Sequence, residues 1–145
     1  MLVANLFAGT LMISGTVMIH TFGLMFLARW MEWIVHWFRL HRHSFAKSVA
    51  IVTTVLGLFF VHTLEVWAWA AAYVLIGVVS DLESALYFST ITFSTLGYGN
   101  VVPLAEWRIF TALEAVNGFL LIGWSTAYLV AASTRHGPFR LGEHF

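Results

Sequence analysis

A long run of residues without a charged side chain opens the sequence, and it constrains the fold more than any other feature. The run extends from Leu2 to Ala28. As a helix it is about 40 Å long, which exceeds the roughly 30 Å apolar core of a bilayer. Two further apolar stretches, 48–79 and 106–134, are also long enough to cross. The predicted fold class is therefore an all-α membrane protein with three transmembrane helices.

The first stretch, residues 1–28, has a cleaved signal peptide as its alternative interpretation. No basic residue precedes the apolar run, and no clear cleavage site follows it. The run is also long for the apolar part of a signal peptide. We therefore expect residues 1–28 to form an N-terminal transmembrane helix.

The composition of the whole chain agrees with a membrane environment. Of the 145 residues, 60% are hydrophobic and 10% are charged, and the mean hydropathy is +0.85. Seven Lys and Arg balance seven Asp and Glu, so nucleic acid is not an expected partner. The sequence has no cysteine, which excludes disulfides and thiolate metal sites. The lipid bilayer is the expected surrounding.

The distribution of basic residues predicts how the chain is oriented. Four of the seven Lys and Arg lie in segment 29–47 among three tryptophans, a mixture typical of a membrane surface. We expect this segment to be a cytoplasmic, interfacial and partly helical linker. Two more basic residues lie in 135–145, the expected short cytoplasmic tail. The N-terminus is then outside and the C-terminus cytoplasmic, in a multi-pass protein of the plasma or inner membrane.

An apolar segment that is too short to cross the membrane lies between the second and third stretches. It is preceded by Ser80-Asp81-Leu82-Glu83, which matches a capping box with Ser80 as the cap. A helix over 81–94 is about 20 Å long, so it enters the bilayer and must return. The sequence predicts a re-entrant helix followed by a loop at 95–99.

Glycines at alternate positions, Gly97 and Gly99, give this loop an unusual backbone. Both can adopt positive φ at little cost, which turns successive carbonyl oxygens to the same side. Non-helical backbone inside a membrane is tolerated only where protein buries it or water lines it. One column of carbonyls cannot surround an ion, whereas four columns about an axis can. The loop therefore predicts a homotetramer.

The stretch Ser94-Thr95-Leu96-Gly97-Tyr98-Gly99-Asn100 resembles the signature of the pore-loop potassium channel family, Thr-Val-Gly-Tyr-Gly usually followed by Asp. The resemblance implies a pore domain over 48–134, with outer helix, pore helix, selectivity filter and inner helix. It also implies passive flow of K⁺ through a tetramer, no enzymatic activity and no cofactor besides K⁺. The implied filter residues are Thr95, Leu96, Gly97, Tyr98 and Gly99, with K⁺ at the first four.

Residues around the filter have roles that the resemblance implies. Tyr87 and Phe88 would pack against the ring of Tyr98, while Ile91 stands where some members carry a carboxylate. Asn100 replaces the usual Asp at the outer mouth. Together with Glu114 these residues form the expected support of the filter.

Glu114 lies inside the third stretch, where an ionised carboxylate is costly. It is expected either to brace the filter from behind or to attract cations to the cavity, and a hydrogen-bonded packing residue is the alternative. Gly118 aligns with the hinge glycine of the family, with close helix packing as its alternative. Residues spaced to face a central cavity are Ile122, Ser125, Thr126 and Leu129.

Other polar residues in the apolar stretches suggest further contacts. His62 and Glu65, three residues apart, share a helix face and can hydrogen-bond, and Asn117 can bond between helices. No regular series of basic residues occurs in the first stretch, so a voltage sensor is not expected. The sequence does not identify the gating stimulus, and an unidentified regulatory protein is one candidate for it.

Two other functions are the alternatives. The first is a weakly selective monovalent cation channel, because Leu96 and Asn100 depart from the family pattern. The second is a haem protein with His20 and His62 as axial ligands. Counted from the predicted inner helix ends, these two histidines differ in depth by about 9 Å, which makes a shared haem awkward.

Overall fold

The computed structural model describes residues 1–37, 44–99, 102–103 and 105–136. These residues form helices and connecting loops without any strand, which confirms the predicted all-α fold class. The elements are α1 (Leu2–Trp37), α2 (Ser44–Leu75), α3 (Leu82–Phe93), the short 3₁₀ helix η2 (Ala105–Trp107) and α4 (Arg108–His136).

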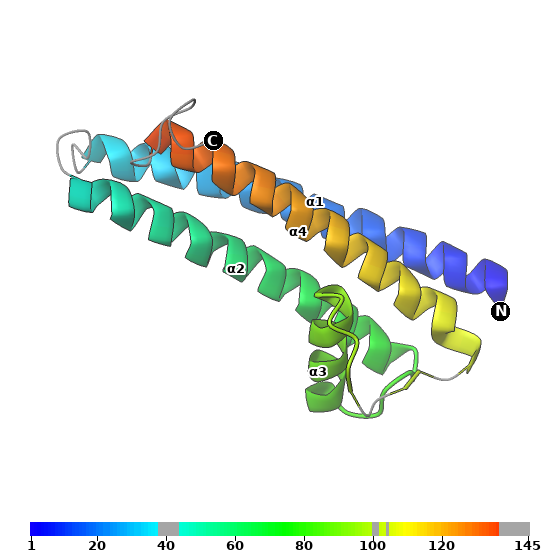
Figure 1. Cartoon of the computed structure of the whole chain (residues 1–145). Coiled ribbons are helices and arrows are strands. Elements are labelled where there is room, and N and C mark those ends of the chain that lie inside the picture. The colour runs from blue at the N-terminus through cyan, green and yellow to red at the C-terminus, as the bar shows by residue number, and fades with distance from the viewer. Residues whose placement is uncertain (38–43, 100–101, 104, 137–145) are drawn as a thin grey trace.

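Three of these helices are long and apolar enough to span a membrane. The spans cover 2–33, 48–75 and 105–134, with mean hydropathies of 1.8, 2.0 and 1.5. Figure 1 shows α1 and α4 running alongside each other from the same end, with α2 antiparallel to both. The short α3 lies beside one end of the three long helices, near the N-terminus of the chain. This arrangement agrees with a re-entrant helix on one side of the membrane.

Both helices that flank the first connection extend further into it than predicted. Helix α1 continues to Trp37 and α2 begins at Ser44, so most of the expected linker, 29–47, belongs to these helices. The added residues of α1 include Met, Glu and Trp and no Gly or Pro, so nothing in the sequence stops the helix. Residues 38–43, in the middle of that linker, lie outside the described residues.

Helix α2 ends four residues before the predicted position 79 because Gly77 terminates it. Gly77 has φ +75°, the left-handed conformation that glycine adopts most easily. Its N–H donates to the Val74 carbonyl at 3.2 Å, and the Val78 N–H donates to the Tyr73 carbonyl at 2.9 Å. This pair of hydrogen bonds is a Schellman motif, which stops the helix and turns the chain toward α3.

The N-cap of α3 is Asp81, so the predicted cap at Ser80 is wrong. Asp81 has the extended backbone of a cap residue, and its carboxylate accepts a hydrogen bond from the Ser84 N–H at 2.8 Å. Both Ser and Asp can cap a helix, and here the carboxylate takes the role. The hydrogen bond from Ser84 holds the pKa of Asp81 below its usual value of 3.8.

This cap predicts a pH dependence that the variant Asp81→Asn isolates. A carboxyl group whose pKa is lowered by folding stabilises the fold above its unfolded pKa, and this stabilisation is lost as pH falls through the folded value. The difference in unfolding temperature between wild type and Asp81→Asn should therefore be constant above about pH 5 and change below about pH 4. A constant difference down to pH 2 would show that the carboxylate is not the cap.

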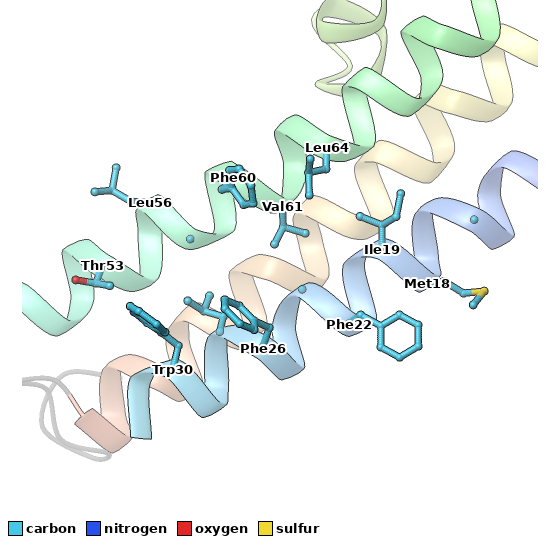
Figure 2. Close-up of a pocket in the computed structure, with 14 residues that line it drawn as sticks. Met18, Ile19, Phe22, Phe26, Trp30, Thr53, Leu56, Phe60, Val61 and Leu64 are labelled. Carbon is cyan, nitrogen blue, oxygen red and sulfur yellow. The ribbon is translucent and has the colours of Figure 1, made fainter. Parts of the chain in front are cut away.

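Helices α1 and α2 approach closely at glycines and form an apolar groove. A Cβ on Gly23 would lie 2.6 Å from Val61, and one on Gly57 would lie 2.5 Å from Leu27. The groove has a volume of about 980 Å³, and Figure 2 shows Phe22, Phe26 and other apolar side chains along it. Its apolar lining suits contact with lipid or another apolar surface.

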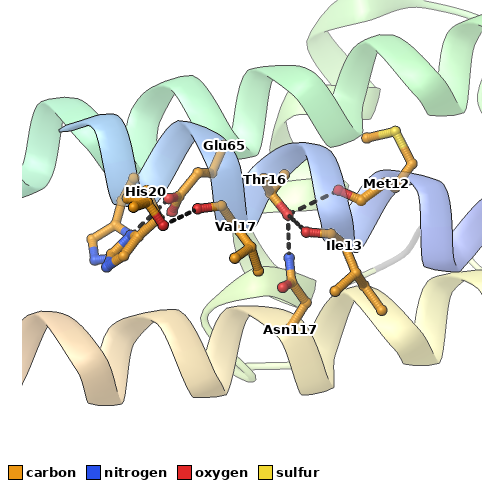
Figure 3. A network of polar contacts seen from close by, with 9 residues as sticks. Met12, Ile13, Thr16, Val17, His20, Glu65 and Asn117 are labelled. Atoms are coloured by element: carbon orange, nitrogen blue, oxygen red, sulfur yellow. Dashed lines mark hydrogen bonds and ion pairs between the residues drawn. The ribbon is translucent and has the colours of Figure 1, made fainter. Parts of the chain in front are cut away.

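Buried polar side chains fix α1 against α4. At one end, Asn5 donates to the Glu106 carbonyl at 2.8 Å and accepts from the Phe110 N–H at 2.9 Å, so it binds the start of α4. Further along, Asn117 donates to the Thr16 hydroxyl at 2.8 Å (Figure 3). This last contact confirms that Asn117 bonds between helices. The N-terminal helix α1 is thus packed against the other two spans.

Candidate functional site

In the loop after α3, residues with positive φ alternate as its glycines suggest, but they lie two residues earlier than predicted. Positive φ occurs at Gly97 (+69°) and at Thr95 (+59°), but not at Gly99. The prediction is confirmed for Gly97 and wrong for Gly99. Thr95 directly follows the C-cap residue Ser94, a position where helices commonly adopt the left-handed conformation.

Hydrogen bonds tie this loop back to the last turn of α3. The Thr95 N–H donates to the Thr92 carbonyl at 2.9 Å, and the Gly97 N–H donates to the Ile91 carbonyl at 3.0 Å. Positive φ in a β-branched residue such as Thr95 costs about 1–3 kcal/mol. The structure therefore retains a strained backbone in the segment that resembles a selectivity filter.

The residues of this segment are exposed in the single chain. Leu96 is 53% and Tyr98 is 68% exposed, and Thr95, Gly97 and Gly99 are exposed as well. The hydrogen bonds of its Thr95 and Gly97 N–H groups and the close contacts at Gly99 are made with its own α3.

Two of the predicted supporting residues lie beside the filter segment. A Cβ on Gly99 would lie 2.6 Å from Ile91 Cδ1 and 3.4 Å from Tyr87 Cε1. Phe88 instead points into the subunit, where its ring centroid is 5.2 Å from that of Tyr73, so its predicted contact with Tyr98 is wrong. The reason is helical phase, because Phe88 lies on the buried face of α3 and Tyr87 on the exposed face. Asn100 lies outside the described residues.

Glu114 lies behind α3, fully buried between helices. Its carboxylate accepts a hydrogen bond from the Tyr73 hydroxyl of α2. Its other oxygen is 2.5 Å from the Ser89 hydroxyl of α3, which also lies 3.0 Å from the Val66 carbonyl. Glu114 therefore joins α2, α3 and α4. The geometry agrees with a brace and also with the alternative, a hydrogen-bonded packing residue. The full burial inside the subunit contradicts attraction of cations to a cavity.

Removing this carboxylate is expected to destabilise the fold strongly. Glu114→Ala leaves the Tyr73 hydroxyl buried without its partner, which costs about 1–3 kcal/mol. It also removes buried side-chain volume and leaves the Ser89 hydroxyl with the Val66 carbonyl alone. The free energy of unfolding, measured by titration with a denaturing detergent, should fall by about 2–5 kcal/mol. Glu114→Gln, whose amide keeps a donor and an acceptor, should lose less. The exposed Glu106→Ala serves as the control, and an equal loss in that variant would contradict the brace.

Gly118 packs directly against the end of α3. A Cβ at this position would lie 2.8 Å from the Phe93 Cα and closer still to the Phe93 carbonyl oxygen. Helix α4 runs unbroken through Gly118. Close packing thus accounts for the glycine in this structure, and its role as a hinge stays a prediction.

The residues predicted to line a cavity do not share one face. Ile122 and Thr126 are exposed, whereas Ser125 is buried at 5% exposure and Leu129 packs partly on the cluster around Leu24 and Leu27. Ser125 belongs to the buried stripe of α4 that continues from Leu121 one turn earlier. Its prediction as a pore-lining residue is therefore wrong.

His62 and Glu65 form the predicted pair, with His62 Nδ1 2.7 Å from Glu65 Oε2. His20 of α1 joins them, with its Nδ1 2.8 Å from Glu65 Oε1. The His20 and His62 rings are 5.5 Å apart, so the predicted 9 Å offset is wrong. The ends of α1 and α2 at Trp37 and Ser44 place each histidine 17 or 18 residues from the inner end. Both Nδ1 atoms face Glu65, and this arrangement does not favour haem.

Sequence reasoning missed several residues of these contacts. Their common signal is a polar side chain inside an apolar stretch, which has to find a partner in the membrane. The residues are Asn5, Thr16, Tyr73 and Ser89.

A family model described as an ion channel matches residues 61–135, more than half of the chain. The voltage-gated potassium channel Kch of Escherichia coli (strain K12) is 31% identical over 101 residues, which are 66% of this chain and 24% of that protein. The chain thus spans about a quarter of the length of this curated relative. No solved structure matches it. With a short helix and a filter-like loop between two candidate spans, the chain belongs to the pore-loop potassium channel family.

Proposed function

We propose that this chain is the subunit of a homotetrameric, potassium-selective channel that allows passive K⁺ flow across a membrane. The observation that carries the proposal is the left-handed backbone at alternate residues, Thr95 and Gly97. This alternation directs consecutive carbonyls to one side, as a column of ion ligands requires. The carbonyls of Thr95, Leu96, Gly97 and Tyr98 are the proposed K⁺ ligands.

Four copies follow from what the single chain leaves uncovered. The filter segment 95–99 is exposed, and such non-helical backbone is stable at membrane depth only when protein buries it or it lines water. Three more copies about a central axis supply both surroundings. In this tetramer the exposed Ile122 and Thr126 of α4 line the inner pore.

The proposed orientation places the filter at the outer side of a plasma or inner membrane. Six of the seven Lys and Arg then lie on the cytoplasmic side, and Arg108 alone lies outside. Such an asymmetry is typical of membrane proteins with this orientation. The N-terminus is external and the tail 135–145 is cytoplasmic.

Two measurements on the purified full chain test this proposal. Native mass spectrometry in detergent is expected to give four chains per particle. Vesicles that contain the protein and are loaded with K⁺ should then release K⁺ faster than protein-free vesicles. A stable monomer or dimer would contradict the tetramer, and vesicles that release Na⁺ equally fast would favour a weakly selective cation channel.

A further inference from the structure

The His20, His62 and Glu65 cluster lies between α1 and α2. His20 and Glu65 are both fully buried, and the His62 side chain is 20% exposed. One potential ligand atom from each residue lies within 4.8 Å of the other two. Figure 3 shows His20 of α1 and Glu65 of α2 pointing toward each other across the helix interface.

The cluster has an unsatisfied polar atom and a buried carboxylate that no Lys or Arg among the described residues pairs with. Nε2 of His20 is buried and has no hydrogen-bond partner among the described residues. Glu65 contacts two histidines, and none of its ion pairs within the described residues involves Lys or Arg. A carboxylate at such a depth in a span is costly unless a positive charge balances it. A bound divalent cation would supply that charge and take imidazole nitrogens as ligands.

The ligand types indicate which cation fits. Two imidazoles and one carboxylate suit Zn²⁺ and similar transition metal ions, whereas Mg²⁺ and Ca²⁺ prefer oxygen ligands. Zn–N and Zn–O distances are about 2.0–2.2 Å, so tetrahedral ligands lie roughly 3.3 Å apart. The separations of 2.8 and 2.7 Å between each histidine Nδ1 and a Glu65 oxygen are close to that spacing.

We propose that His20, His62 and Glu65 form a binding site for Zn²⁺ or a similar transition metal ion. The site joins α1 to α2. The His62 ring is 5.8 Å from that of Phe93 at the end of α3, and the His20 ring is 5.1 Å from that of Trp124 in α4. A bound ion would thus fix the contact among all four helices directly below the filter.

The test uses Co²⁺ as a spectroscopic probe of the purified full chain, prepared without a histidine tag. The other five histidines are replaced together by glutamine, which leaves the three proposed ligands as they are: His36, His41, His43, His136 and His144. This variant is expected to bind one Co²⁺ per chain with the intense visible absorption of a four-coordinate ion, and Zn²⁺ should displace it. Absence of this absorption would overturn the proposal.

A cysteine variant identifies a ligand directly because the chain has no cysteine of its own. In the same background, His62→Cys is expected to give a new thiolate-to-cobalt charge-transfer band. Thr63→Cys, on the exposed side of the same helix turn, is the matched control and should give no such band. Equal spectra in both variants would overturn the assignment of His62 as a ligand.

Substitution of the carboxylate completes the test. Glu65→Gln is expected to weaken Zn²⁺ binding at least tenfold. Unchanged affinity would show that the ion binds elsewhere. These outcomes do not depend on conduction, so the site can be confirmed or refuted whatever the ion selectivity of the channel.

Discussion

Gly118→Ala is expected to abolish K⁺ flux and to destabilise the chain. The added methyl group would lie 2.8 Å from the Phe93 Cα and closer still to the Phe93 carbonyl oxygen. These separations are far inside normal contact distance, and backbone cannot rotate away as a side chain does. Overpacking of this kind costs about 1–3 kcal/mol. Phe93 is followed directly by Ser94 and Thr95, so the shift displaces the base of the filter. K⁺ release from vesicles and thermal unfolding both measure the effect.

Gly123→Ala is the matched control in the same helix. A Cβ at Gly123 meets no atom within 4 Å, and alanine favours helix by about 1 kcal/mol over glycine. This variant should conduct normally in vesicles and be as stable as wild type or more so. If Gly118→Ala also kept wild-type flux and stability, the close contact with Phe93 would be contradicted.

Gly97→Ala is expected to remove selective conduction with little effect on the rest of the fold. Gly97 has φ +69°, and a left-handed backbone costs an L-residue with a Cβ about 1–2 kcal/mol. The least costly way to relieve this backbone strain is a rotation of the peptide, which turns a proposed ligand carbonyl away from the neighbouring carbonyls. K⁺ and Na⁺ flux through vesicles with this variant should be absent or equal.

Gly77→Ala separates this local effect from the general cost of positive φ. Gly77 has φ +75° and, like Gly97, open space where a Cβ would lie, but it terminates α2 and lies outside the filter segment. It should lose similar stability and keep its K⁺ selectivity. Equal loss of selectivity in both variants would mean that the backbone of Gly97 has no special role.

The main features of the fold could be predicted because the membrane restricts what an apolar sequence can form. A stretch such as 2–28 without charge has to be a spanning helix, and the short segment after Asp81 cannot reach across. The signature around Gly97 identified the loop. The partnership of His62 with Glu65 followed from their spacing within one helix.

Other features depended on the tertiary structure. The early end of α2 depends on a positive φ at Gly77, which a sequence only permits. The burial of Ser125 and Phe88 depends on the rotation of each helix about its axis, which shifts with every error in a helix boundary. An error of the same kind concealed the contact between His20 and Glu65. The depth of His20 was counted from a predicted helix end at residue 28, whereas α1 ends nine residues later, at Trp37. The contact between Gly118 and Phe93 arises only when α3 packs against α4.

Selectivity for potassium is best tested by the reversal potential of wild-type channels in a planar bilayer, with K⁺ on one side and Na⁺ on the other. Each tenfold preference for K⁺ moves this potential by about 59 mV at 25 °C. A potassium-selective filter predicts a reversal potential displaced from zero by well over about 59 mV, with the K⁺ side negative. A reversal potential near zero would contradict a potassium-selective filter at Thr95 to Gly99.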